Sequence, residues 1–194
     1  DYAAADIYNN TIDGGSGVTS YSVFVDSIST TTNLKNNILM ATSGTNNYCL
    51  YEETNPPLEI KNNDFIFCST SPYFDNDALC TGNGDNDANP NTCTLTEMEA
   101  LIDITGGASG NVSLDPMFTD IDGADNNALT MADNDWHLTT DAPTYTNANV
   151  LEGGLDLSAN FTTDKDAQTR TAVITKGPSN TGAAGWSMGA YEFD

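Results

Sequence analysis

Five aspartates lie within residues 119–138, TDIDGADNNALTMADNDWHL, a stretch that contains no lysine or arginine. They are Asp120, Asp122, Asp125, Asp133 and Asp135. Carboxylates this close repel one another unless a cation binds them or salt screens them. Ca²⁺ prefers carboxylate, carbonyl and water oxygens, and Gly123 allows the loop to turn. The pattern therefore predicts a Ca²⁺ loop, although DIDGAD lacks the complete EF-hand sequence with its closing Glu.

A second acidic loop is a weaker candidate for Ca²⁺. Its carboxylates are Asp75, Asp77, Asp85 and Asp87. For both loops two other interpretations stay open. The aspartates can hold solvent-exposed turns through side-chain hydrogen bonds to the backbone, or they can belong to a surface adapted to high salt.

Catalytic chemistry has less support in the residue pattern. A polysaccharide lyase needs a basic group, and the chain offers only Arg170, Lys35, Lys61, Lys165 and Lys176. A glycosidase needs two carboxylates at a defined separation, which so acidic a chain satisfies on paper by chance. His137 stands between Trp136 and Leu138, a pattern typical of a half-buried strand. No GxSxG or HExxH motif occurs, and the cysteine spacings fit no common zinc finger.

Charge excludes several classes of partner. Among the 194 residues, 28 acids oppose 5 bases, which gives a formal net charge of −23. Such a chain repels nucleic acid and anionic membranes, and no apolar run reaches the length of a membrane span. The acids are 21 Asp and 7 Glu, and 17 residues are aromatic, which indicates a folded chain and not an acidic tail.

The four cysteines, Cys49, Cys68, Cys80 and Cys93, are candidates for disulfides. Four cysteines allow three pairings, and the sequence favours Cys80–Cys93 only weakly. Disulfides together with few lysines indicate an extracellular protein. The chain begins at DYAAADIYNN, inside what looks like a repeat, so we expect a mature or clipped piece of a longer secreted protein.

Three segments repeat along the first third of the chain: IYNNTID from Ile7, LKNNILM from Leu34 and IKNNDFI from Ile60. Their Asn-Asn pairs are 27 and then 26 residues apart. Turn clusters such as DGGSG separate them, so the repeat predicts a solenoid of short strands. The first repeat places Ile7 and Ile12 inside, with a bend between them because an odd separation would otherwise put them on opposite faces.

The Asn-Asn pairs predict a ladder across the coils. One Asn of each pair is expected to adopt the left-handed backbone conformation. The other is expected to bond its equivalent in the next coil. The six residues are Asn9, Asn36, Asn62, Asn10, Asn37 and Asn63. Outside the core, Tyr8, Lys35 and Lys61 would form a row that is either a solvated face or a small sugar-facing spot.

The order of the later motifs resembles the carboxyl-terminal part of choice-of-anchor Q proteins, which are secreted or surface bacterial proteins with a right-handed parallel β-helix. The motifs are GNVSLDPMF, DGADN, DNDWHL, TDKDAQTR and MGAYEF. The chain departs from the family at Ala142–Thr146, where APTYT replaces the usual SPAID. The resemblance implies an all-β fold, a short right-handed parallel β-helix followed by an irregular C-terminal cap.

Three regions follow from this interpretation. Residues 1–68 would form the coils, 69–110 a Cys- and Asp-rich insertion with a short helix within CTLTEMEALID, and 111–194 the cap. Trp186, Met188, Tyr191 and Phe193 are expected to plug the open end of the solenoid.

The function favoured by the sequence is a non-enzymatic structural module at the bacterial cell surface or outside the cell, adhesin-like or filament-forming and stabilised by Ca²⁺. The alternative is a β-helix that binds or degrades polysaccharide. Expected partners are a larger parent chain, a second copy stacked end to end, or a polysaccharide; whether the chain is an enzyme stays open.

Overall fold

The structure, a computed structural model, describes residues 5–26, 32–76, 80, 91–127, 130, 132–139, 150, 153–170 and 185–192. Across these residues the chain forms short strands and a single helix, α1 (Leu95–Ala100). The predicted all-β class is confirmed at this level, and the short helix lies within CTLTEMEALID as expected. No helix in this part of the chain is long and apolar enough to cross a membrane.

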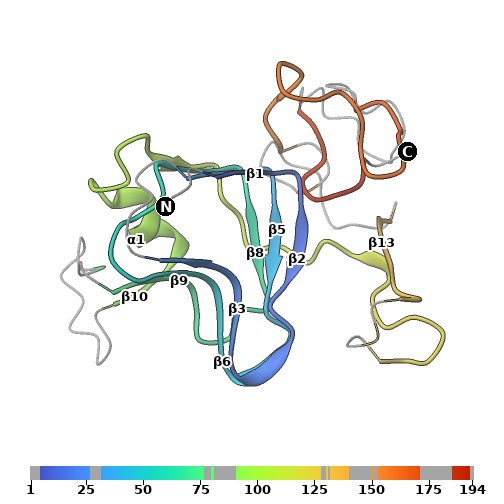
Figure 1. The fold of residues 1–194 in the computed structure, drawn as a ribbon, viewed down its shortest axis with the longest axis horizontal. Coiled ribbons are helices and arrows are strands. Elements are labelled where there is room, and N and C mark those ends of the chain that lie inside the picture. The colour runs from blue at the N-terminus through green and yellow to red at the C-terminus, as the bar shows by residue number, and fades with distance from the viewer. Residues whose placement is uncertain are drawn as a thin grey trace.

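Three successive turns of the chain contribute three strands each. The first has β1 (Asp6–Tyr8), β2 (Thr11–Asp13) and β3 (Ser16–Val25). The second has β4 (Asn33–Lys35), β5 (Ile38–Met40) and β6 (Ser43–Glu52). The third has β7 (Glu59–Lys61), β8 (Asp64–Ile66) and β9 (Ser71–Asp75). Each strand pairs in parallel with its equivalent in the next turn, so β1–β4–β7, β2–β5–β8 and β3–β6–β9 lie in three sheets around a common interior (Figure 1).

The register of the sheets follows the sequence repeat. The paired rows are Ile7–Leu34–Ile60 in the first sheet and Ile12–Leu39–Phe65 in the second. These rows pack in one core with Val23, Leu50 and Tyr73 of the third sheet. Fully burying an apolar side chain of this size contributes about 1.5–3 kcal/mol, so the aligned rows hold the turns together.

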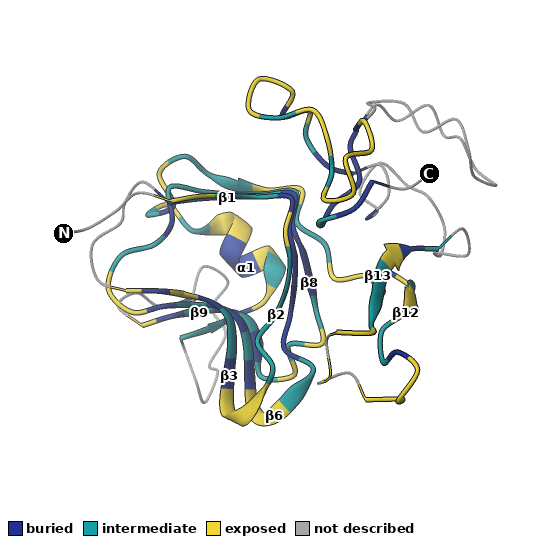
Figure 2. Ribbon diagram, turned by 45° about the vertical axis from the view of Figure 1, so that its right-hand side comes forward, coloured by how far each residue is buried: buried dark blue, intermediate teal, exposed yellow. Residues whose placement is uncertain are grey.

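The end of the stack beyond β7, β8 and β9 is covered by residues 91–112. β10 (Thr92–Cys93) pairs antiparallel with β9, and β11 (Ala108–Ser109) pairs parallel with β7. Between them α1 begins at a capping box, in which Thr94 Oγ1 accepts the amide of Glu97 and the Glu97 carboxylate accepts the amide of Thr94. Met98 of α1 is fully buried in the core, and the buried side of the helix faces the sheets (Figure 2).

Both disulfides join parts of this stack. Cys49–Cys68 links β6 to the residues just after β8, and Cys80–Cys93 links Cys80, which follows β9 in the chain, to β10. The second is the pairing that the sequence favoured weakly. Each bridge closes a short loop, and disulfides of this kind stabilise a fold by about 2–4 kcal/mol, mainly by restricting the unfolded chain.

The C-terminal part of the chain packs along the side of the stack. β12 (Phe118–Asp120) and β13 (Asp135–Leu138) form an antiparallel hairpin. Ile38 of β5, Leu138 and Met188 bury one another in a second apolar cluster, on the opposite face of the β2–β5–β8 sheet from the main core. We call residues 153–170 and 185–192 the C-terminal segment and its contact with the stack the seam; Figure 1 shows the segment beside the sheets.

The position of the C-terminal segment differs from the plug expected from the sequence. Trp186 and Met188 are buried, but Met188 contacts Ile38 in the middle of the stack and not an open end. Gly189, at φ 87°, lies directly against Ile38 and Thr11, where a larger residue would collide. The end beyond β9 is covered instead by α1 and its neighbours, and Phe193 lies outside the described residues.

Candidate binding site along the C-terminal seam

The Asn-Asn pairs build two columns with different tasks. The first residue of each pair, Asn9, Asn36 and Asn62, has φ of 51°, 57° and 54°. This left-handed conformation, which Asn tolerates better than most residues, turns the chain from the first sheet into the second. It also points the two side chains of a pair in different directions, and we call the two sets the outer and the inner column.

The inner column is a ladder of amides inside the stack. Asn37 Nδ2 donates to Asn63 Oδ1 at 2.8 Å, and Asn63 Nδ2 donates to Asn111 Oδ1 at 3.1 Å. The backbone amides of Asn37 and Asn63 donate to the same two oxygens at 3.0 Å. At the other end Asn10 donates its amide to Asn37 Oδ1 at 3.0 Å. These bonds satisfy polar groups that the bend would otherwise leave buried and unpaired.

A fourth rung was missed in the sequence. Gly110 has φ 68° and takes the place of the left-handed Asn, while Asn111 extends the inner column. The pair reads GN instead of NN, and it comes 48 residues after Asn62 because α1 and its flanking loops intervene. Gly and Asn are the two residues that favour this backbone conformation, so a search for [NG]-N would have found it.

The outer column binds the C-terminal segment. Asn36 Oδ1 accepts the amide of Leu155 at 2.7 Å, and Asn36 Nδ2 donates to the carbonyl of Leu155 at 2.8 Å. Asn62 Nδ2 donates to the carbonyl of Gly153 at 2.6 Å, and Asn9 Nδ2 donates to that of Ser187 at 2.9 Å. Three equivalent side chains, one in each turn, thus fix the backbone of the segment against the stack.

Arg170 completes this attachment. Its guanidinium is buried and donates to the carbonyls of Ser187, Gly189 and Ala190 and to the carboxylate of Glu192. Burial lowers the pKa of Arg170, and the charge of Glu192 opposes that effect. Because both terminal nitrogens of its guanidinium donate within the segment, Arg170 has a structural task and is a poor candidate for the base of a lyase.

The aspartates predicted to bind Ca²⁺ lie in and around the β12–β13 hairpin. Asp120 Oδ1 accepts the amide of Gly123 at 3.0 Å, and Asp125 Oδ1 accepts that of Asn127 at 3.0 Å. Asp133 lies against Gly123, whereas Asp135 is bonded to His137. Among the residues that the structure describes, no three His, Cys, Asp or Glu side chains are grouped so that they could hold a metal ion. Asp122 belongs to the same turn and is partly buried.

Most of the second predicted loop, including Asp77, Asp85 and Asp87, lies outside the described residues. Asp75 is described and is fully buried at the end of β9, where it pairs in register with Glu52 of β6. It lies in the stack and far along the chain from the hairpin. Ca²⁺ at either place remains a prediction.

His137 connects the hairpin to the C-terminal segment. Its Nδ1 lies 2.5 Å from Asp135 Oδ1, its Nε2 lies 3.1 Å from Asp166 Oδ2, and its ring packs 4.1 Å from that of Tyr191. Burial lowers the pKa of His137, but hydrogen bonds and charge from Asp135 and Asp166 outweigh it, and the net pKa is raised. The histidine therefore bridges a carboxylate of the hairpin and a carboxylate of the C-terminal segment.

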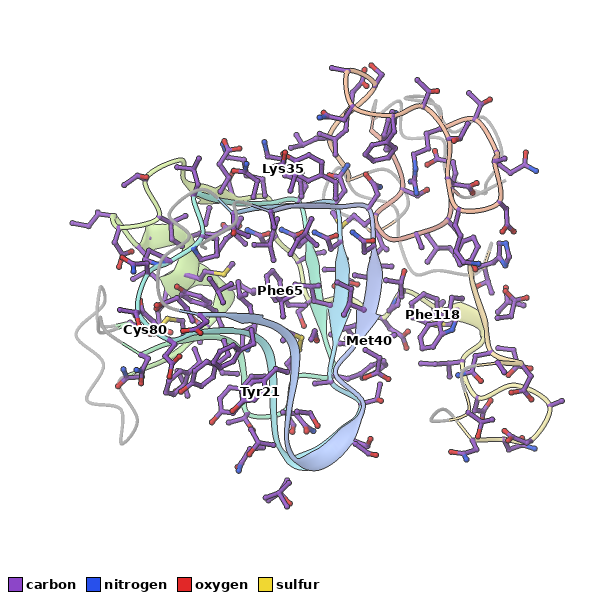
Figure 3. All side chains as sticks on the ribbon, viewed as in Figure 1. Tyr21, Lys35, Met40, Phe65, Cys80 and Phe118 are labelled. Carbon is purple, nitrogen blue, oxygen red and sulfur yellow. A yellow bond between two sulfur atoms is a disulfide. The ribbon has the colours of Figure 1, made fainter. Side chains whose placement is uncertain are left out.

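A cavity of about 330 Å³ opens where the seam meets the hairpin. Its walls are Thr11, Asp13, Met40, Ala132, Asn134, Trp136, Lys165, Ala190 and Tyr191. Figure 3 shows Met40 on the sheet and Phe118 on the hairpin that faces it. The cavity thus combines two aromatic rings, one ammonium group, one carboxylate and two neutral polar side chains. Sequence reasoning had considered some of these residues, such as Trp136, Lys165 and Tyr191, but each for another reason.

The two positive charges in the row formed by Tyr8, Lys35 and Lys61 are balanced by neighbouring carboxylates. Lys35 and Lys61 both form ion pairs with Glu59, the latter at 2.6 Å. These hydrogen bonds, first from Lys35 and then from Lys61, lower the pKa of Glu59. Tyr8 donates to Asp6, and burial followed by that hydrogen bond raises the pKa of Tyr8 to about 12. The row is therefore close to neutral and offers little free positive charge.

Aromatic side chains form a second repeated feature that sequence reasoning missed. On the outside of the third sheet Tyr21 stacks on Tyr48, and Phe24, Tyr51 and Phe74 stack in a parallel column. The centroid spacings of that column are 5.3 and 4.5 Å. The rings turn their faces to one another, so they hold adjacent turns together. Their signal was the 27-residue spacing of Tyr21 to Tyr48 and of Phe24 to Tyr51.

No protein-family model, curated protein or solved structure matches this chain. The resemblance to choice-of-anchor Q proteins therefore remains a prediction.

Proposed function

We propose that the chain is a non-enzymatic structural module that works outside the cell, and that its turns belong to a right-handed parallel β-helix of the choice-of-anchor Q type. The observation that carries this proposal is the parallel register that continues through three turns. The inner Asn column joins these turns by hydrogen bonds. A stack of this kind is stiff because each turn satisfies the backbone and side-chain hydrogen bonds of the next.

The extracellular location is supported by covalent chemistry. Both disulfides, Cys49–Cys68 and Cys80–Cys93, connect neighbouring parts of the stack. Disulfides persist in oxidising surroundings and are rare in the cytosol. The strongly acidic composition adds solubility and repels nucleic acid.

The proposal that the chain is not an enzyme is supported by the contacts of its basic residues, which bind other groups of the protein. Lys35 and Lys61 share Glu59, Lys165 donates to the hydroxyl of Tyr191 at 2.9 Å, and Arg170 is buried. Lys176 lies outside the described residues. A lyase would need one of these groups free beside its substrate, whereas a structural module needs none.

The partner that fits this module is another coil, from a parent chain or from a second copy. β1, β2 and β3 are the outermost strands of their three sheets, all at the same end of the stack. Unpaired strand edges attract further strands. A small cavity lined by Val23, Phe24 and Val25 lies at this end as well.

We propose in addition that Ca²⁺ binds the β12–β13 hairpin and draws its aspartates together. The expected result is a higher melting temperature in millimolar Ca²⁺ than in EGTA, with Mg²⁺ at equal ionic strength as the control for screening. Equal melting temperatures in all three solutions, with no metal in the purified protein, would exclude the Ca²⁺ site.

Limited proteolysis with thermolysin and a turnover assay test the structural module together. We expect the stack, residues 5–26, 32–76 and 91–112, to resist cleavage until the disulfides are reduced. Incubation with uronate and neutral polysaccharides is expected to release no new reducing ends or unsaturated products. Rapid cleavage inside the oxidised stack would argue against a rigid module, and product formation would establish an enzyme instead.

A further inference from the structure

We propose that the cavity at the seam binds one uncharged sugar unit of a glycan, with Trp136 and Tyr191 as its aromatic walls and Thr11, Asp13 and Lys165 as its polar contacts. This goes beyond the structural role proposed above. It would give the module a ligand site at a place that the repeat alone does not define.

The size and the walls of the cavity fit a small ligand. Its volume of about 330 Å³ lies at the lower end of the range for small-molecule sites, about 300–1,000 Å³. Trp136, Tyr191 and Met40 provide apolar surface, and the C–H face of a pyranose ring packs against such surface. The remaining walls offer hydrogen-bonding groups that suit the hydroxyls around the edge of the same ring.

Both aromatic walls are held in place by contacts with neighbouring side chains. Trp136 packs edge-to-face on Phe118, with 5.1 Å between ring centroids. Tyr191 accepts a hydrogen bond from Lys165 Nζ at 2.9 Å and contacts the ring of His137 at 4.1 Å. Walls that are already fixed lose little conformational entropy when a ligand binds, which favours affinity.

The polar groups are also held in place. Asp13 accepts hydrogen bonds from the amide of Gly15 at 2.9 Å and the hydroxyl of Thr42 at 2.8 Å, which orient its carboxylate. Thr11 Oγ1 accepts the amide of Ala190 at 3.1 Å and carries its own proton for a further partner. A hydroxyl of the ligand can donate to Asp13, and another can accept from Lys165.

The charge of the cavity favours an uncharged ligand. One carboxylate, Asp13, and one ammonium group, Lys165, line it, and their charges cancel. Asp164 and Asp166 flank Lys165 in the chain, and the whole protein carries a formal charge of −23. An anionic sugar would be repelled on approach, and a cationic ligand would meet Lys165 inside.

The two tryptophans provide a direct probe. Trp186 is only 2% exposed, whereas Trp136 is partly exposed beside the cavity, so quenching by acrylamide reports mainly on Trp136. Ligand in the cavity is expected to protect this fluorescence. The full chain is titrated with neutral glucan, xylan, mannan and galactan oligosaccharides and with oligogalacturonate, and affinity is measured in parallel by calorimetry.

Variants locate the binding. Trp136→Ala removes one wall, and Lys165→Met removes the ammonium group while it keeps most of the side-chain stem; each is expected to weaken binding by about tenfold or more. Phe24→Ala and Lys35→Met remove an exposed aromatic ring and a lysine elsewhere on the surface, and they are expected to leave the affinity unchanged. Since Trp136→Ala also removes the contact with Phe118, Lys165→Met decides the matter if the first variant unfolds.

Binding of at least one neutral oligosaccharide, protection of Trp136 and loss in Lys165→Met together support the proposal. No binding across the panel, preference for oligogalacturonate, or binding that Lys165→Met leaves unchanged overturns it. These results leave the structural module intact, because that proposal fails on a different observation: release of sugar products from the bound oligosaccharide.

Discussion

The two Asn columns differ in what they hold, although they come from the same three dipeptides. The inner column bonds each turn to the next, and the partners of Asn37 and Asn63 are other rungs or backbone within the stack. The outer column bonds to Gly153, Leu155 and Ser187, which come from an irregular part of the chain. One repeat therefore specifies both a regular stack and the docking of a non-repeating segment. This separation predicts that the stack and the segment can be disturbed independently.

The largest effect is expected at the inner column. Asn63→Ala removes the acceptor of two Asn37 donors and the donor to Leu34 and Asn111, all in the buried interior. Each buried group left unpaired costs about 1–3 kcal/mol, so a loss of about 4 kcal/mol in the free energy of unfolding is expected. Urea denaturation measures it. Asn10→Ala, at the exposed end of the same column, serves as the control, and an equal loss there would show that burial does not decide the effect.

The disulfides come next. Replacing both Cys49 and Cys68 by Ala is expected to lower the free energy of unfolding by about 3 kcal/mol. Because this bridge lies within the stack, the thermal transition of the stack should move while the seam contacts stay as they are. Calorimetry of this variant is compared with that of Cys80→Ala/Cys93→Ala. A transition that does not move in the first variant would contradict the assignment of Cys49–Cys68.

The outer column is expected to have a smaller effect, confined to the seam. Asn36→Gly keeps the left-handed backbone but removes both side-chain bonds to Leu155, which we expect to cost about 2 kcal/mol. Asn36→Ala adds backbone strain, on the order of 1 kcal/mol. The difference between the two variants in urea denaturation separates the strain from the contacts. If Asn36→Gly proved as stable as the natural chain, the outer column would have no part in docking.

The stability of the stack is expected to depend on pH through Asp64. It is fully buried on the β2–β5–β8 sheet, and its Oδ1 accepts the amide of Leu114 at 2.9 Å. Burial raises its pKa well above the ordinary value of 3.8; the Leu114 bond lowers it, and Asp115 raises it further. Because the folded pKa exceeds the unfolded one, its contribution to stability is complete below the unfolded pKa and is lost as pH rises through the folded pKa.

Asp64→Asn keeps an acceptor for Leu114 without a charge. We expect this variant to be more stable than the natural chain near about pH 7, by a gain on the order of 1 kcal/mol, and the gain to vanish in acid. Thermal melts across the acid-to-neutral range measure it. A constant difference between the two chains at every pH would mean that Asp64 does not titrate in the folded state.

His137 gives the smallest effect, at the edge of the seam. Its pKa is raised in the folded chain, so its bridge to Asp135 and Asp166 stabilises below the unfolded pKa of 6.5 and is lost as pH rises through the folded value. The side chain is about half exposed, and solvent screening limits the effect to under about 1 kcal/mol. His137→Gln is expected to flatten the pH dependence of melting near neutrality. Lys35→Gln, remote from the seam, is the control and should leave that slope unchanged.

The repeated part of this molecule could be predicted because the same packing and hydrogen bonds recur in each turn. The spacing of the Asn-Asn pairs predicted both the left-handed bends and the aligned rows around Leu34 and Leu39, since every turn must solve the same packing problem. The fourth rung escaped notice because Gly110 replaces Asn and an insertion breaks the period. The aromatic column from Phe24 to Phe74 escaped because the pattern of apolar and polar residues was read only around the Asn pairs.

The seam could not be predicted in the same way. Its contacts join side chains such as Asn36 to backbone atoms of Leu155. Every residue has these backbone atoms, so the residue type at position 155 does not indicate the contact. The cavity brings together Asp13, Trp136 and Lys165 from three distant parts of the chain, and no spacing in the sequence relates them. Arg170 was considered as a catalytic base because its charge is visible in the sequence, whereas its burial becomes visible only in the fold.

Amide hydrogen exchange tests the division between the two columns most directly. The amide of Leu155 bonds to the side chain of Asn36 and that of Gly189 to its backbone carbonyl, whereas the amides of Asn37 and Asn63 bond to side chains of the inner column. In Asn36→Gly we expect Leu155 to lose its protection and Asn37 and Asn63 to keep theirs. Loss of protection at all of these amides together would contradict the account, because it would show that the stack and the C-terminal segment open as one unit.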